Sequence, residues 1–178
     1  MNYKTKLREQ AKNIRKTLNL SEISSEIVSN IRKSEIYKNA TKIMIFYPLK
    51  NEINLLPLAE DNKEFFLPRV KENIIECCPW NKNDKLKISS LNIKEPITNS
   101  VDKNTIDIIF VPALFADKNF YRLGYGGGYY DRLLTDYKGL SMIVIPEELL
   151  TECLPIEDYD IKCSGIFTQK KCLFTLRG

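Results

Sequence analysis

A chain of 178 residues is long enough for one domain with a single hydrophobic core. With 43% hydrophobic and 28% charged residues, its composition is that of an ordinary soluble globular protein. No apolar run approaches the roughly 20 residues that would cross a bilayer, and the polar start MNYKTKLREQ is no secretory signal. We therefore expect a cytoplasmic protein with no membrane partner.

The chain contains no histidine, which excludes imidazole-activated nucleophiles and His-ligated zinc. Its five cysteines are odd in number and lack CxxC or zinc-ligand spacing, so we expect reduced, mostly buried thiols. Any catalysis must then use carboxylates, Lys, Arg, Tyr, backbone amides or a bound cation. The net charge of +4 is mild and suits an anionic small ligand at least as well as nucleic acid.

Two helices are predicted at the start of the chain. Residues 3–18 have helical spacing of apolar residues, as does a second segment that we expect Ser21 to cap. Lys4, Arg8 and Lys12 recur every four residues and form a basic stripe, which on its own would indicate a solvated helix face. The apolar faces of the two helices consist of Leu7, Ala11, Ile14 and Leu18, and of Ile23, Ile27 and Ile31.

Short apolar runs farther along the chain predict buried strands. These runs are 42–47, 64–68, 73–80, 106–112, 140–146 and 165–176. The polar stretch 81–105 is expected to be a loop, and a helix is expected from about 127 to 137. Apolar strands that alternate with helices predict an α/β fold with a mainly parallel sheet. Because ligands bind at the carboxyl ends of such strands, the loop after 106–112 is the natural place for a site.

That loop lies in the segment FVPALFADKNFYRLGYGGGYYDRLL, residues 110–134, which holds four of the seven glycines. Clustered glycines let backbone N–H groups converge on a ligand, and phosphate oxygens are the usual guest before a helix N-terminus. Arg122 precedes the glycines and can bind a phosphate in bidentate fashion. Asp131 follows them and can hold Mg²⁺, which takes a few carboxylates, waters and phosphate oxygens.

Glycines alone are weak evidence for phosphate binding. The loop is not a Walker motif, because no Lys-Ser/Thr pair follows, and Tyr129 stands where GxGxxG needs its third glycine. A tight strand-to-helix turn with a solvated Arg122 and a helix-capping Asp131 explains the same residues equally well.

The full string is far more specific than its glycines. VP, then Asp117, then RLGYGGGYYDRLL, closely resembles the signature of the 5-formyltetrahydrofolate cyclo-ligase family, also called methenyltetrahydrofolate synthetase. The resemblance covers nearly the whole chain and implies a single domain over residues 1–178. Further similar segments follow in the family's order: YPLKNEI at 47–53, LPR at 67–69, IKEP at 93–96 and LPIEDYD at 154–160. Three positions depart from the family pattern: Leu149, Tyr159 and Ser164.

The resemblance implies the conversion of 5-formyltetrahydrofolate and ATP to 5,10-methenyltetrahydrofolate, ADP and phosphate. A formamide carbonyl is a poor electrophile, and phosphorylation of its oxygen creates both a reactive carbon and a leaving group. The folate N10 then attacks that carbon, a five-membered ring closes and phosphate departs. The enzyme's task is positioning and charge stabilisation, which requires no histidine.

The resemblance also implies roles for individual residues. The catalytic residues would be Arg122 and Tyr129. The magnesium ligands would be Asp131 and Asp160. ATP would be bound by Lys4, Arg8, Arg122, Leu123, Gly124, Tyr125, Gly126, Gly127, Gly128, Tyr129 and Tyr130. Folate would be bound by Tyr47, Glu52, Tyr125, Gly126, Gly127, Gly128 and Tyr129.

Some of these residues have ordinary structural explanations as well. A carboxylate at Glu52 can accept the N–H groups of the amino-pyrimidinone edge of a pterin, although a loop Glu needs no ligand. Tyr47 can likewise be a plain strand-end residue, and Asp160 a surface acid. Trp80 can stack on an aromatic ligand, but a lone Trp is more often part of a core.

The fold that the resemblance implies is a three-layer α/β sandwich of the kind shared by sugar-phosphate isomerases and CoA transferases. Two alternatives remain open: another ATP-dependent enzyme such as a kinase, and a binding module for nucleotide or RNA. RNA binding is disfavoured because the basic residues are interleaved with 23 acids. We expect a monomer that binds small molecules and no nucleic acid.

Overall fold

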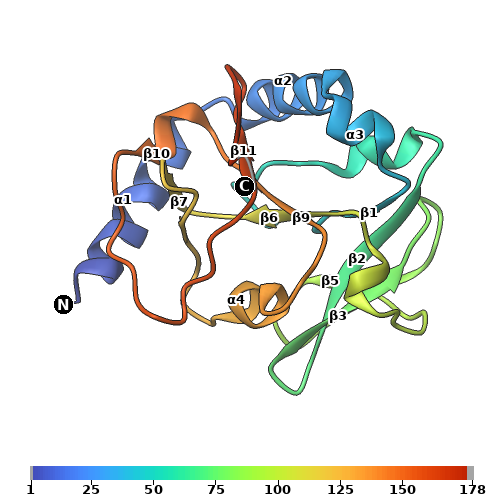
Figure 1. Cartoon of the computed structure of the whole chain (residues 1–178). Coiled ribbons are helices and arrows are strands. Elements are labelled where there is room, and N and C mark those ends of the chain that lie inside the picture. The colour runs from blue at the N-terminus through green and yellow to red at the C-terminus, as the bar shows by residue number, and fades with distance from the viewer. Residues whose placement is uncertain (1, 176–178) are drawn as a thin grey trace.

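The computed structural model describes residues 2–175 and is built around a seven-stranded sheet with the order β12-β11-β9-β6-β1-β2-β3 (Figure 1). Its strands are β1 (Lys42–Met44), β2 (Glu64–Lys71), β3 (Ile74–Pro79), β6 (Ile108–Pro112), β9 (Leu140–Val144), β11 (Gly165–Phe167) and β12 (Cys172–Phe174). The inner pairs are parallel, and only the two edge strands, β12 and β3, pair antiparallel. The predicted α/β fold with a mainly parallel sheet is confirmed.

Helices cover both faces of this sheet (Figure 1). The α-helices are α1 (Tyr3–Thr17), α2 (Leu20–Lys33), α3 (Glu35–Asn39) and α4 (Tyr129–Leu134), and the 3₁₀ turns are η1 (Leu56–Glu60), η2 (Lys103–Thr105) and η3 (Glu147–Leu149). On one face α2 and α3 bury Ile27, Ile31 and Tyr37 in a core shared with Phe110 of β6. On the other face α4 and α1 contribute to a second core. These two cores sandwich the sheet because strand side chains alternate between its faces.

Helix α1 packs against β7 and η3 rather than across the central strands. Strand β7 (Phe115–Asp117) is the middle of a three-stranded sheet between β10 (Leu150–Thr151) and β8 (Arg122–Leu123). Asp117 fixes this region because its buried carboxylate accepts the amides of Asn119, Tyr121 and Leu154 at 2.9–3.0 Å. The small sheet thereby presents the start of the glycine segment to α1.

The stretch 81–105 is not a plain loop, contrary to the prediction. It contains a small antiparallel hairpin of β4 (Leu86–Ile88) and β5 (Lys94–Pro96), followed by η2. Strands of three residues, with Lys87 paired to Glu95 across the ladder, have too little apolar alternation to be recognised in the sequence.

Other predicted boundaries also need correction. Asn19, not Ser21, caps α2: its side chain accepts the amide of Glu22 at 3.3 Å, and Ser21 lies in the first turn. Helix α4 has six residues instead of the expected eleven, because it starts only after the left-handed Gly128 and ends at Leu134, before Asp136 adopts a positive φ. The run 165–176 is a hairpin of two strands and not one strand, and its last position lies outside the described residues.

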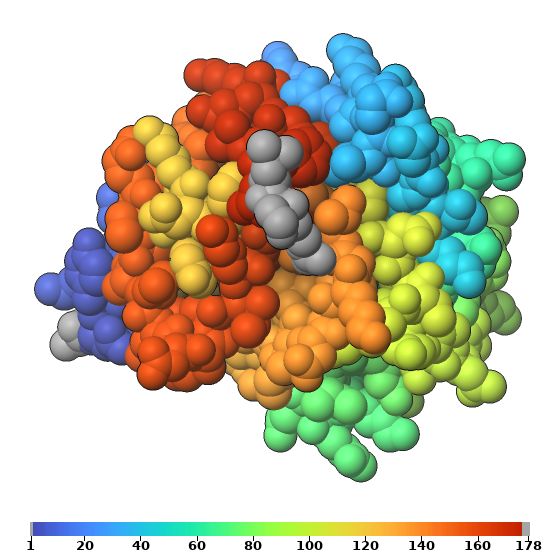
Figure 2. All heavy atoms as spheres, in the orientation of Figure 1, coloured from blue at the N-terminus to red at the C-terminus, as the bar shows by residue number. Residues whose placement is uncertain are grey.

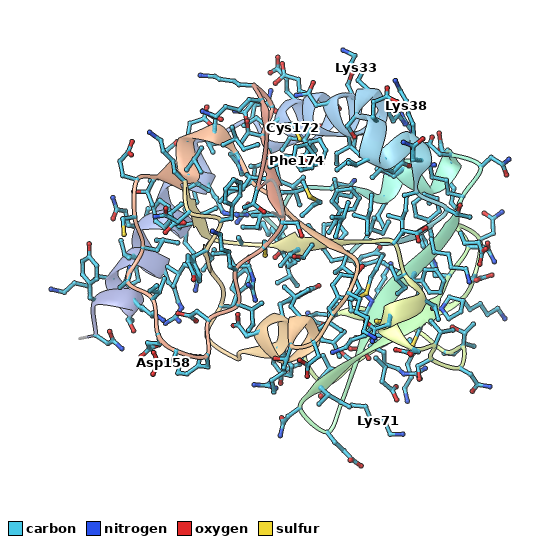
Figure 3. The ribbon with its side chains drawn as sticks, viewed as in Figure 1. Lys33, Lys38, Lys71, Asp158, Cys172 and Phe174 are labelled. Carbon is cyan, nitrogen blue, oxygen red and sulfur yellow. The ribbon has the colours of Figure 1, made fainter. Side chains whose placement is uncertain are left out.

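Strands β2 and β3 form a long hairpin closed by Glu72 and Asn73, which both adopt positive φ. Two consecutive residues of this kind form the turn that matches the twist of paired strands. Lys71 lies beside this turn and projects from the lower end of the molecule, far from Cys172 and Phe174 on the opposite edge strand (Figure 3). The hairpin therefore extends well beyond the central sheet.

None of the helices between residues 2 and 175 has both the length and the apolar character that crossing a membrane would require. All five cysteines are free thiols, and Cys77, Cys78 and Cys163 are buried, as expected. Trp80 is buried in the core under α2 and α3, also as expected.

Candidate active site

A cavity of about 440 Å³ opens at the carboxyl ends of the parallel strands. Tyr47 reaches it from the loop after β1, Pro68 from β2 and Pro112 from the end of β6. The chain leaves β1 toward β2 on one side, and it leaves β6 toward β9 and β11 on the other. Such a switch point between neighbouring strands is where α/β folds bind ligands, and the cavity lies where the sequence predicted a site.

Every residue that the sequence predicted for the site lines this one cavity. They are Lys4, Arg8, Tyr47, Glu52, Arg122, Leu123, Gly124, Tyr125, Gly126, Gly127, Gly128, Tyr129, Tyr130, Asp131 and Asp160. They come from four separate parts of the chain, which the fold brings together. Their individual roles stay predictions.

The glycine loop is shaped for close approach to a ligand. Gly126 (φ 108°) and Gly128 (φ 65°) adopt backbone conformations that other residues rarely take. Arg8 of α1 lies directly against this loop: its Nε donates to the carbonyl of Gly124 at 2.9 Å. A Cβ atom at position 126 would sit 3.4 Å from the guanidinium carbon of Arg8. Because α4 is short, the loop amides and Arg8, rather than a long helix dipole, provide the positive potential here.

The first turn of α1 carries a second cation into the cavity. The ammonium of Lys4 donates to Asp160 at 2.9 Å and to Glu157 at 2.6 Å. Burial lowers the pKa of Lys4, but the two carboxylates more than offset this effect and raise it overall. The two segments lie side by side on the molecular surface, with the N-terminus in blue and residues 150–160 in orange-red (Figure 2). Asp158 marks the same loop beside the start of α1 (Figure 3).

The guanidinium of Arg122 holds Asp131 in place. Its Nη2 donates to Asp131 Oδ1 at 2.8 Å and its Nη1 to the carbonyl of Ile161 at 3.0 Å, and the side chain is only 4% exposed. Asp131 Oδ1 also accepts the amide of Ile161 at 3.0 Å. Since Ile161 follows Asp160, these bonds fix the two aspartates near each other. A bidentate phosphate contact by Arg122 would require its present bonds to break.

A buried carboxylate lies at the other end of the cavity. Glu52 is 9% exposed, and one of its oxygens accepts the amide of Leu49 at 2.7 Å. Burial raises the pKa of Glu52, while the Leu49 amide, the hydroxyl of Tyr125 and the charge of Arg15 oppose the rise. Such a group can accept paired N–H groups from a ligand that excludes water from it.

Comparisons with known proteins agree with this geometry. The model of the 5-formyltetrahydrofolate cyclo-ligase family matches residues 1–169. The chain belongs to the 5-formyltetrahydrofolate cyclo-ligase family. These proteins are ligases of folate one-carbon metabolism that use ATP as co-substrate.

The chain is similar to family members from distant organisms. It is 29% identical over 139 residues to a cyclo-ligase of Haemophilus influenzae, which covers 70% of this chain and 73% of that protein. It is 26% identical over 150 residues to a cyclo-ligase of Mus musculus, covering 73% and 74%. The NMR structure of Aquifex aeolicus 5,10-methenyltetrahydrofolate synthetase has a TM-score of 0.88 at 31% identity, covering 99% of this chain and 95% of that one.

Sequence reasoning missed one buried residue of this cyclo-ligase site, Arg15. It is 3% exposed and donates to the carbonyls of Asn51, at 2.7 Å, and Ala113. Arg15 thus ties α1 to the loop that carries Glu52 and to the segment after β6. Its Nε has no hydrogen-bond partner among residues 2–175. The predicted basic stripe continued from Arg8 to Lys12, but Lys12 is exposed and Arg15 is the buried residue in this part of α1.

Two further contacts shape the cyclo-ligase cavity and were also missed. Arg132 Nη2 donates to the carbonyl of Gly127 at 2.9 Å, and its Nε donates to that of Asn73 at 2.9 Å, so it links the glycine loop to the β2–β3 hairpin. Leu91 and Ile93 of the β4–β5 hairpin add apolar surface to the cavity. Arg132 lies within the family-like string YYDRLL, so the sequence offered a reason to include it in the site. No sequence feature indicated that the β4–β5 hairpin contributes to the cavity.

Proposed function

We propose that this chain catalyses the ATP-dependent cyclisation of 5-formyltetrahydrofolate to 5,10-methenyltetrahydrofolate, with release of ADP and phosphate. The observation that carries the proposal is that one cavity joins a glycine loop with two cations beside it to a buried carboxylate. A glycine loop flanked by Lys4 and Arg8 suits phosphates, and the buried carboxylate of Glu52 suits the N–H edge of a pterin. A single-ligand enzyme or a plain nucleotide sensor has no need of both.

The chemistry explains why both ligands must share one cavity. The γ-phosphoryl group of ATP moves to the formyl oxygen, the folate N10 attacks the activated carbon, and phosphate leaves with that oxygen. Direct transfer requires the formyl oxygen in line with the terminal phosphate, so most of the rate gain comes from positioning and charge stabilisation. In our proposal Glu52 and Tyr47 orient the folate, and Arg8, Lys4 and the loop amides orient the phosphates.

Two residues have roles close to the transferred group in this proposal. Arg122 is held against Asp131, so we assign it the task of keeping that carboxylate aimed at the cavity. Tyr129 begins α4, and its ring packs under the guanidinium of Arg132, 5.0 Å from the ring centroid. There it would border both the nucleotide and the folate, as the family resemblance suggests.

Mg²⁺ belongs to the proposal as the ion that accompanies ATP. Among residues 2–175 no group of three or more potential ligand side chains gathers, but Mg²⁺ needs only one or two carboxylates when phosphate oxygens and waters complete its shell. Asp131 and Asp160 both line the cavity, and among the described residues each accepts its hydrogen bonds through one oxygen only. These residues therefore fit the ion, which would neutralise part of the phosphate charge.

Several broader features complete the proposal. We propose that the layers of helix, sheet and helix are of the kind found in sugar-phosphate isomerases and CoA transferases. We also propose that residues 1–178 act as one catalytic domain, as a monomer, in the cytoplasm. Free thiols at all five cysteines suit that reducing compartment.

The proposal is tested by incubating the purified protein with 5-formyltetrahydrofolate, ATP and Mg²⁺ while recording the near-ultraviolet absorbance of the methenyl product. Product should form only when all three are present. Turnover without ATP, or no turnover with it, would show that the cavity serves another reaction.

A further inference from the structure

Arg132 of α4 contacts the glycine loop but does not itself line the cavity. Its Nη2 donates to the carbonyl of Gly127 and its Nε to the carbonyl of Asn73, both at 2.9 Å. Its guanidinium also lies 5.0 Å from the ring centroid of Tyr129. One planar side chain therefore connects the glycine loop, the β2–β3 hairpin and an aromatic ring. The proposed reaction gives Arg132 no role of its own.

The β2–β3 hairpin is the rigid end of this connection. Its strands pair without interruption up to Lys71 and Ile74, and Asn73 belongs to the tight turn that joins them. An ion pair between Arg69 and Glu76, at 2.8 Å, spans the two strands. Because a guanidinium is a planar fork, a bond from Nε to this turn also fixes the direction of Nη2. The hairpin therefore sets the point at which the glycine loop is held.

The bond from Arg132 fixes the direction of the peptide group between Gly127 and Gly128. In a planar trans peptide, the carbonyl and the N–H that follows it point in opposite directions. Since the Gly127 carbonyl points to Arg132, the N–H of Gly128 points away from Arg132. Both glycines line the cavity, and neither of their amides has a hydrogen-bond acceptor among residues 2–175. The Gly128 amide is therefore available to a ligand.

A peptide group between two glycines needs an outside contact to keep one orientation. Glycine adopts many backbone conformations, and a half-turn of this peptide group would exchange the N–H for a carbonyl oxygen that repels phosphate. Side chains at these positions cannot restrict the rotation instead. A Cβ at Gly127 would lie 2.6 Å from a ring carbon of Tyr129, and one at Gly128 would lie 2.9 Å from Nη1 of Arg132. The hydrogen bond from Arg132 supplies the restriction.

We propose that Arg132 is a positioning residue for the reaction: it holds the Gly127 carbonyl away from the cavity, so that the Gly128 amide stays directed at a phosphate oxygen of ATP. Arg132 acts through the loop and touches neither ligand. Both of its bonds go to neutral carbonyls, so its fork geometry matters more than its charge. This inference rests on the proposed function, because it takes ATP as the ligand of the loop.

The first test measures ATP binding in the presence of Mg²⁺ by titration calorimetry, which needs no turnover. Arg132→Lys keeps the charge but has all its donors on one nitrogen, so it cannot reproduce the fork. Kd for ATP should rise roughly three- to thirtyfold in Arg132→Lys and in Arg132→Met. Lys138→Ala is the control for charge, because this exposed lysine lies beyond the end of α4.

Three outcomes of this titration are decisive. A raised Kd in both Arg132 variants, with Lys138→Ala close to wild type, is the expected result. An equal affinity in Arg132→Lys and wild type would overturn the inference and leave the proposed reaction standing. A wild-type protein that binds no ATP would overturn both.

The second test observes the loop without any ligand. The chain has seven glycines, so selective ¹⁵N labelling of glycine gives a simple amide NMR spectrum. In Arg132→Lys the signals of Gly127 and Gly128 should shift and broaden as the peptide group exchanges between orientations, while Gly139 and Gly165, outside the loop, should stay unchanged. Unchanged signals of Gly127 and Gly128 would refute the role of Arg132. Changes at all the glycines would show a general role in folding and would equally refute it.

Discussion

The two ends of the main cavity are built in different ways. At the end that we propose for the phosphates of ATP, here called the phosphate end, charged side chains from distant parts of the sequence pair with one another: Lys4 with Asp160, and Arg122 with Asp131. At the end that we propose for the folate, here called the folate end, Glu52 is buried and has no ion-pair partner within residues 2–175. Its nearest support is the amide of Leu49.

This difference predicts that the two ends are sensitive to different changes. The phosphate end must exchange internal partners for ATP and its cation, so it depends on having the right charges in place. The folate end depends on a carboxylate staying ionised in a place where burial opposes ionisation. Substitutions at either end should therefore weaken the binding of the ligand proposed for that end. A change of pH should act mainly on the folate end, through the ionisation of Glu52.

The largest effect is expected from Asp131→Asn. Asparagine keeps the size and can still accept the amide of Ile161, but it removes the negative charge that Arg122 faces. We expect kcat to fall by at least about two orders of magnitude, a loss of about 2.7 kcal/mol in transition-state stabilisation. A high Mg²⁺ concentration should restore part of the lost kcat. Asp136→Asn, beyond the end of α4 and exposed, is the control. A normal kcat with an unchanged Mg²⁺ curve would remove Asp131 from the active site.

Arg8→Ala tests the phosphate end through ATP. Loss of a charged hydrogen-bonding group typically costs about 1.5–3 kcal/mol, so KM for ATP should rise roughly ten- to a hundredfold while KM for folate changes little. Lys12→Ala removes an equal charge one turn further along α1, where the side chain is exposed and outside the cavity. Steady-state kinetics of the two variants should differ sharply. Identical ATP kinetics would mean that the basic stripe is only a solvated helix face.

Glu52→Gln tests the folate end, where the comparison predicts the opposite selectivity. KM for folate should rise roughly ten- to a hundredfold, with ATP kinetics nearly unchanged. Because burial raises the pKa of Glu52, its ionised form costs stability above the usual pKa of a glutamate, and neutral Gln relieves that cost. Thermal melting at neutral pH should then show that Glu52→Gln is at least as stable as wild type. The control Glu26→Gln replaces an exposed glutamate and should leave the melting temperature unchanged. A destabilised variant would show that Glu52 is structural.

Arg15 should set the pH at which the folate end works. Its charge opposes the rise in the pKa of Glu52, and so do the Leu49 amide and Tyr125. In Arg15→Met the pKa should rise further, so folate affinity should be lost at a higher pH as the solution is acidified. Arg15→Lys should restore much of the profile, because it keeps the charge. Loss of the bonds to Asn51 and Ala113 should also cost about 1–3 kcal/mol of stability. A pH profile of folate KM that is the same in Met, Lys and wild-type proteins would contradict this role.

Much of this arrangement could be predicted from the sequence, for identifiable reasons. The buried strands are runs of apolar residues, and the string from Arg122 to Asp131 is specific enough to place the site after β6. The segments that carry Lys4, Glu52 and Asp160 could be assigned to the same site only through resemblance, because nothing local shows that they meet.

What could not be predicted depends on contacts between distant segments. Arg15 faces inward because the carbonyls of Asn51 and Ala113 lie there, and both are far away in the sequence. The β4–β5 hairpin is held by so few residues that its sequence resembles a loop. Arg122 was expected to face a phosphate, and its pairing with Asp131 depends on the turn between them.

The central claim is that the cavity brings the formyl oxygen of the folate to the terminal phosphate of ATP. The most direct test uses 5-formyltetrahydrofolate labelled with ¹⁸O in the formyl group, with mass spectrometry of the phosphate released. If the formyl oxygen is phosphorylated, each phosphate should carry one labelled oxygen, in equal number to the methenyl product. Unlabelled phosphate accompanying methenyl product would show that the oxygen leaves by another route and would contradict the account.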